Sequence, residues 1–97
     1  MSNIIFRLEE WYADQCDGDW EHEFGIKINS IDNPGWKVSI PLERTSLESK
    51  HLDEVIIDRS DIDWVHCKKH GNEFIAWGGS GNLCEMIELF FSWRDSG

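Results

Sequence analysis

Apolar side chains recur at helical spacing near the start of the chain. They lie three or four positions apart with charged residues between them, which predicts an amphipathic helix. Ser2 or Asn3 can cap its start, and the turn at 17–19, with a glycine suited to a left-handed cap, ends it. The predicted buried face comprises Ile4, Ile5, Leu8, Trp11, Tyr12 and Cys16.

Alternating apolar and polar residues then predict the first strands of an antiparallel sheet. These strands are expected at 24–28 and 36–42. Both must turn their apolar side chains to one face, so the loop has an odd length, most simply residues 33–35, which pairs Ile28 with Ile40. Pro41 lacks a backbone N–H, which places the second strand at an edge of the sheet or ends it there.

A second hairpin is predicted near the middle of the chain. A short strand at 55–57 precedes it, and its own strands are expected at 64–69 and 73–77. Gly71 and Asn72 suit a two-residue turn of the II′ kind, which pairs Cys67 with Ala76. Both faces of this hairpin are then substantially apolar, which a sheet covered on one side does not require.

The last predicted helix is apolar on nearly all sides, and Asn82 with Glu85 predicts a capping box at its start. Such a broad apolar surface must pack on more than a sheet; the first helix, a second copy of the chain or a partner could cover it. The predicted fold class is α+β: a single domain, residues 1–97, in which an antiparallel sheet of four to five strands has the N-terminal and C-terminal helices packed on one face. The polar stripe of the last helix comprises Glu85, Glu88, Ser92 and Asp95.

Charge narrows the possible partners. Nineteen acidic residues face nine basic ones, which gives a net charge of −10. Nucleic acids and anionic membranes are therefore not expected as partners, because both are repelled by a negative protein. A basic protein is the natural complement, and simple solubility is the alternative explanation of the charge.

The cysteines indicate a reducing compartment. There are three, an odd number, and no basic segment followed by an apolar run marks a secretory signal. We therefore expect free thiols and a cytoplasmic location.

Two kinds of chemistry are weakly suggested by the residues. Cys16 with His22, or Cys67 with His66, could serve a small thiol- or metal-dependent enzyme. No paired CxxC spacing is present, and neighbouring strand residues point to opposite faces, so we expect no metal and no cofactor. The glycines at 78–81 could approach a phosphate at a helix start, but no P-loop lysine follows, and a flexible connection is the simpler interpretation.

The carboxylates gather in two clusters, each with a tryptophan. Trp20 lies within the first and Trp64 beside the second. Carboxylates around an aromatic anchor suit an interface with a basic surface, since the charges speed encounter and a desolvated tryptophan contributes affinity. Alternatively, Trp20 belongs to the core and Asp17 or Asp19 caps backbone groups. The first cluster is Asp14, Asp17, Asp19, Glu21 and Glu23, and the second is Asp53, Glu54, Asp58, Asp61 and Asp63.

Several strings in the chain resemble one protein family. The sequences CDGDWEH at 16–22 and DNPGW at 32–36 are the most specific, and Trp64, Cys67 and the glycines at 78–79 agree with them. On these residues the chain resembles the immunity protein 53 family of bacterial polymorphic toxin systems.

The resemblance implies a protein that neutralises a cognate toxin in the cytoplasm of the cell that makes it. The acidic charge favours a basic nuclease domain as that toxin. We therefore expect a non-catalytic toxin inhibitor that has no catalytic residues, with a homodimer through the C-terminal helix as a further possibility. The expected contact residues are Asp17, Asp19, Trp20, Glu21, Asp61, Asp63 and Trp64.

Overall fold

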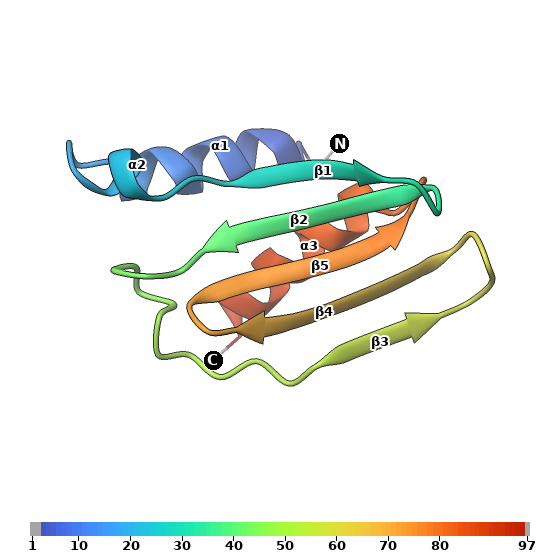
Figure 1. Ribbon diagram of the computed structural model, residues 1–97. Coiled ribbons are helices and arrows are strands. Elements are labelled where there is room, and N and C mark those ends of the chain that lie inside the picture. The colour runs from blue at the N-terminus through green and yellow to red at the C-terminus, as the bar shows by residue number, and fades with distance from the viewer. Residues whose placement is uncertain (1–2, 97) are drawn as a thin grey trace.

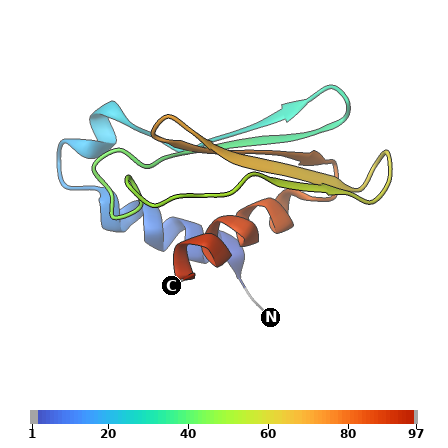
Figure 2. The same cartoon turned by 90° about the horizontal axis from the view of Figure 1, so that it is seen from below.

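The computed structural model describes residues 3–96, which form one five-stranded antiparallel sheet with its two long helices on one face (Figures 1 and 2). The strand order is β1-β2-β5-β4-β3, so β1 and β3 are the edges. This arrangement confirms the predicted α+β class and the packing of both terminal helices on one face. The elements are α1 (Ile4–Gln15), α2 (Trp20–Glu23), β1 (Lys27–Ile31), β2 (Gly35–Pro41), β3 (Val55–Asp58), β4 (Trp64–His70), β5 (Glu73–Gly79) and α3 (Leu83–Asp95).

Helix α1 begins as predicted but buries only half of its predicted apolar face. The Asn3 side chain caps it by accepting a hydrogen bond from the Phe6 N–H at 3.0 Å, and Ser2 lies outside the described residues. The helix runs along the β1 edge of the sheet (Figure 1). Ile5 and Tyr12, expected in the core, are therefore 48% and 37% exposed. The side chains that α1 buries are Ile4, Leu8 and Trp11.

The register of the first hairpin is shifted by two residues along β2 from the predicted one. Ile28 pairs with Val38 rather than Ile40, and β2 already begins at Gly35. Gly35 can pair there because it has no side chain: a Cβ would lie 2.2 Å from the Gly78 carbonyl oxygen on β5. The loop stays odd, so Ile28 still shares a face with the core residues of β2. The strand ends at Pro41 as expected, but it is not an edge, because β2 lies between β1 and β5.

The second hairpin has the predicted register and turn. Cys67 pairs with Ala76, and Gly71 takes a positive φ of 59° in a two-residue connection. The flexible connection predicted after it is wrong, because Gly78 and Gly79 continue β5. A Cβ on Gly79 would lie 2.3 Å from the Ile62 carbonyl oxygen, so this glycine lets the β3–β4 loop close against the strand.

Helix α3 forms the centre of the core, and α1 together with the loop between β2 and β3 covers apolar surface of α3 that the sheet leaves open. Phe90 is fully buried and meets the Trp11 ring edge-on at a centroid distance of 5.3 Å. Because these large side chains are covered within the chain, the reason for expecting a homodimer through this helix no longer holds. The buried residues of α3 are Met86, Ile87, Phe90, Phe91 and Trp93.

No helix within residues 3–96 has the length and apolar character needed to cross a bilayer.

Candidate functional site

The two acidic clusters lie at opposite ends of the sheet. The first lies around the turn between α1 and α2, and Asp58, Asp61 and Asp63 of the second lie around the loop between β3 and β4 (Figure 1). Asp53 and Glu54 precede β3 and lie apart from that loop. Strand β2 spans most of the distance between these ends, and its residues at about 3.4 Å each indicate a separation of roughly 20 Å. The clusters therefore do not form one patch and must be judged separately.

Trp20 is a core residue rather than an exposed anchor. It is 2% exposed, and its indole Nε1–H donates to the Glu43 carbonyl oxygen at 2.9 Å. Its ring also meets Trp11 edge-on at 6.2 Å. These contacts join the turn after α1 to the loop after β2. Trp20 therefore belongs to the core, which was the alternative interpretation, and we do not include it among the proposed contact residues.

Two carboxylates of the first cluster hold the turn in its shape. The Asp17 Oδ1 atom accepts hydrogen bonds from the N–H groups of Asp19 and Trp20, both at 2.9 Å. Glu21 accepts from the N–H groups of Asp17 and Gly18 at 2.9–3.1 Å. Gly18 has the left-handed φ, 95°, that the sequence predicts. The sequence string at 16–22 is therefore a folding motif as well as a source of charge.

These hydrogen bonds also lower the pKa values of both carboxyl groups. The N–H groups of Trp20 and then Asp19 lower the pKa of Asp17. The backbone N–H of Glu21 itself, followed by that of Gly18, lowers the pKa of the Glu21 carboxyl. Both groups are therefore ionised at neutral pH, where a charged acceptor makes the stronger hydrogen bond.

Acid is expected to loosen this turn. Both pKa values are lower in the folded chain, so both groups stabilise the fold above their ordinary values of 4.5 for Glu21 and 3.8 for Asp17, and that contribution is lost as pH falls below them. The Trp20 indole N–H resonance should shift over this range in an NMR titration. Asp17→Asn should show a smaller shift over the same range; a titration curve identical to that of the wild type would contradict the account.

The remaining carboxylates of the first cluster are exposed and mostly uncompensated. Asp14 and Asp19 make no salt bridge with any residue in 3–96. Among these three carboxylates, Glu23 pairs with Arg44 at 2.7 Å on the surface. The turn therefore presents a negative field to solvent, while Asp17 and Glu21 hydrogen-bond to backbone N–H groups of the turn itself.

The second cluster is largely paired within the chain. Asp63 contacts Arg59 at 3.0 Å and accepts from the Asn82 amide at 2.9 Å; the Arg59 hydrogen bond is the main cause of its lowered pKa. Asn82 also reaches Glu85 and makes no side-chain cap, so the predicted capping box does not form. Asp61 stays exposed beside these groups.

Trp64 and the loop before it add apolar surface to this second cluster. Trp64 is half-buried and meets the His66 ring at 5.2 Å, and His66 in turn contacts Asp58 at 2.7 Å. Ile62, which the sequence did not single out, is 76% exposed. Asp61, Asp63 and Trp64 thus share one end of the sheet, with less free negative charge than the first cluster.

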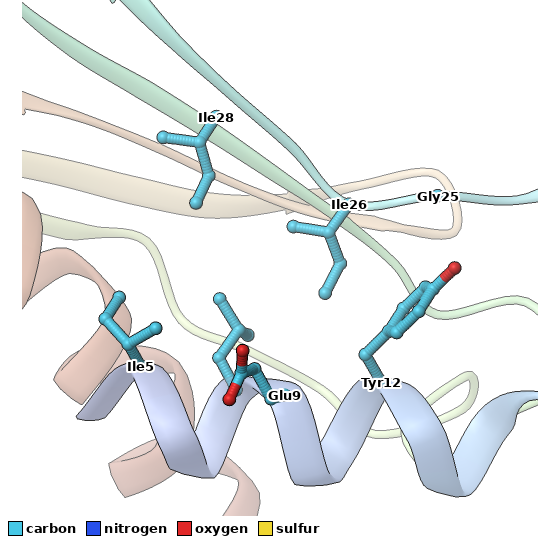
Figure 3. A pocket seen from close by; sticks show the side chains of 7 residues that line it. Ile5, Glu9, Tyr12, Gly25, Ile26 and Ile28 are labelled. Atoms are coloured by element: carbon cyan, nitrogen blue, oxygen red, sulfur yellow. The ribbon is translucent and has the colours of Figure 1, made fainter. Parts of the chain in front are cut away.

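A groove between α1 and β1 was missed by sequence reasoning. It encloses roughly 350 Å³, and the apolar side chains of the two elements face one another across it (Figure 3). Tyr12 links it to the first cluster, because its ring packs edge-on against Trp20 at 6.0 Å. The lining residues are Ile5, Leu8, Glu9, Tyr12, Gly25, Ile26 and Ile28.

The face of the sheet that the helices leave open (Figure 2) carries two lysines beside a tryptophan. Trp77 is half-buried there between Lys37 and Lys68, whose ammonium groups each lie 5.8 Å from its ring. The lysine stems shield the indole, which explains how an apolar hairpin face stays in water. A basic partner is disfavoured on this face and favoured on the α1 side.

The thiol groups offer little support for catalysis. Cys67 is buried in the core, and burial raises its pKa to about 11, which suppresses the reactive thiolate. His66 points to the other face of the sheet, and the Cys16 thiol donates to the Tyr12 carbonyl at 3.3 Å. Within residues 3–96, no three His, Cys, Asp or Glu side chains are grouped to hold a metal ion.

Comparison with protein-family models gives one finding: the model of immunity protein 53 matches residues 5–95. Comparison with curated proteins and with solved structures returned no match. The matched residues include α1 from its second residue onward, the acidic turn, every strand and α3. The protein belongs to the immunity protein 53 family.

Proposed function

We propose that this chain is a non-catalytic immunity protein that binds its cognate toxin domain and thereby neutralises it in the cytoplasm of the producing cell. Family membership supports the immunity role. The observation that carries the binding mode is the first acidic cluster, in which the exposed carboxylates of Asp14 and Asp19 have no cationic partner in the described part of the chain. Uncompensated charge at a surface accelerates association with an oppositely charged partner.

The proposed contact surface is the α1 side of the molecule. Asp14 and Asp19 supply free charge, while Asp17 and Glu21 add charge and keep the turn rigid. A preorganised turn costs less entropy on binding than a flexible one. Asp61, Asp63 and Trp64 form the rival contact surface at the other end of the sheet.

The proposed target is a basic toxin, and a nuclease domain fits this description. A nuclease that acts on a polyanion carries cationic surface around its substrate groove. A protein of net charge −10 complements such a surface and can occupy or obstruct the groove. A standard interface takes roughly 800 Å² per partner. That is a small part of the 5992 Å² surface of this chain, so one edge of the sheet is sufficient.

Co-expression tests the proposed function. The protein encoded by the gene adjacent to this one should arrest growth when produced alone in a heterologous host. Growth should be restored when this chain is produced with it, and the two should co-purify at equal stoichiometry. A toxic neighbour that this chain neither binds nor neutralises would contradict the proposal.

A further inference from the structure

Helix α1 carries a second stripe of side chains beyond its buried one. Ile5, Glu9 and Tyr12 lie four and three positions apart, beside the buried stripe that contacts the core. Ile5 and Tyr12 are partly exposed because no strand of the sheet lies above them. The helix thus extends past the β1 edge and leaves an apolar floor uncovered (Figures 1 and 3).

The edge strand above this floor is also unpartnered on its outer side. Strand β1 pairs only with β2, and within residues 3–96 its backbone makes no other hydrogen bond. Alternate N–H and C=O groups of an edge strand point outward and can pair with another strand. Ile28 on β1 is 38% exposed and faces α1 across the groove (Figure 3). The unpaired outer edge of β1 and the exposed apolar stripe of α1 beneath it together form a slot that fits an extended chain.

We propose that an extended segment of the toxin domain adds to β1 as a sixth strand and lays its helix-facing side chains over Ile5, Glu9 and Tyr12. This inference rests on the proposed function and specifies how the toxin is held. The stripe on α1 advances about 6 Å and then 4.5 Å, from 1.5 Å per residue. Alternate residues of a strand are about 6.8 Å apart, so three successive helix-facing side chains span about 13.6 Å, roughly 3 Å more than the stripe. Long side chains such as lysine can bridge that difference.

The side chains of the slot specify the chemistry of that strand. Glu9 is an exposed carboxylate between two apolar side chains, and it has no salt-bridge partner among residues 3–96. The strand that fits carries an apolar, a basic and an apolar residue at alternate positions. A second copy of this chain fits poorly, because two molecules of charge −10 would bring their acidic α1 helices together.

Glu9→Lys tests the inference, with Glu10→Lys as its matched control. Both residues are exposed on α1 and both substitutions change the net charge equally, but Glu10 lies in a depression with Arg7 and Asp14, outside the groove. Against the protein encoded by the adjacent gene, both variants should slow association similarly. Only Glu9→Lys should raise the dissociation rate, by roughly tenfold or more, because it leaves a basic group of the toxin unpaired.

A synthetic peptide supplies a second readout that does not require the toxin. In this peptide every second residue is threonine, and the residues between the threonines are valine, lysine and valine in that order. A companion peptide has glutamate in place of the lysine. NMR shifts should be confined to β1 and α1 and should be larger for the lysine peptide. Equal dissociation rates for Glu9→Lys and Glu10→Lys would overturn the strand-addition inference, and so would peptide-induced NMR shifts outside β1 and α1. Neither result would contradict the proposed function, provided that the wild-type chain binds the toxin. Failure of the wild-type chain to bind the adjacent toxin would instead contradict the proposed function, and the peptide would still show whether β1 and α1 accept an added strand.

Discussion

Trp20→Ala is expected to lower the free energy of unfolding by about 3–5 kcal/mol, the usual loss when a buried tryptophan is truncated. The indole is 2% exposed and packs edge-on against Trp11 and Tyr12. The substitution removes this packing and leaves the Glu43 carbonyl without its Nε1–H donor. Since small domains have only about 5–15 kcal/mol in total, the variant should be largely unfolded at modest urea concentrations.

Trp64→Ala is the matched control for this experiment. Trp64 is half-buried, and its ring contact is with His66 at the surface. Urea denaturation followed by circular dichroism should show a much smaller loss for Trp64→Ala than for Trp20→Ala. Equal losses in the two variants, or a Trp20→Ala chain as stable as the wild type, would show that the string at 16–22 does not serve the fold.

Reversing the free charges of the first cluster should have the largest effect on binding. The double variant Asp14→Lys with Asp19→Lys removes two exposed carboxylates, neither of which accepts a side-chain hydrogen bond in the described chain. The fold should therefore survive. Its association rate constant with the toxin should fall by roughly 10–100-fold at low ionic strength, since steering by complementary charge can raise rates by that amount.

The second cluster provides the control for charge. Glu54→Lys with Asp61→Lys changes the net charge by the same amount along the β3 edge, on the opposite side of the sheet from α1. Stopped-flow association measured across salt concentrations should show a weak effect for this variant and a strong, salt-dependent effect for the first. The opposite ranking would identify Asp61, Asp63 and Trp64 as the contact surface.

Local sequence patterns predict much of this fold. Alternation and the Gly71-Asn72 turn place the second hairpin in its correct register. The predicted register of the first hairpin is wrong by two residues, because the true register depends on the close approach of Gly35 to the Gly78 carbonyl on β5. That contact joins residues far apart in the sequence, so turn preferences alone do not reveal it.

The groove is hidden from the sequence for a similar reason. Ile5 and Tyr12 follow the same helical period as Trp11, so periodicity assigns all three to the core. Their exposure depends on α1 lying beside an edge strand, and strand order is a tertiary property. The acidic residues at 17–21 are equally ambiguous, since a carboxylate that caps a turn and one that meets a partner look alike in sequence.

The central claim is that this chain holds its toxin along β1 and the adjoining α1–α2 side. Amide hydrogen exchange, measured on the free chain and on its complex with the adjacent toxin, tests it most directly. In the complex, the outward-facing N–H groups of β1 and the amides of residues 5–21 should exchange more slowly than in the free chain. Protection confined to residues 56–64, or to the Trp77 face of the sheet, would contradict it.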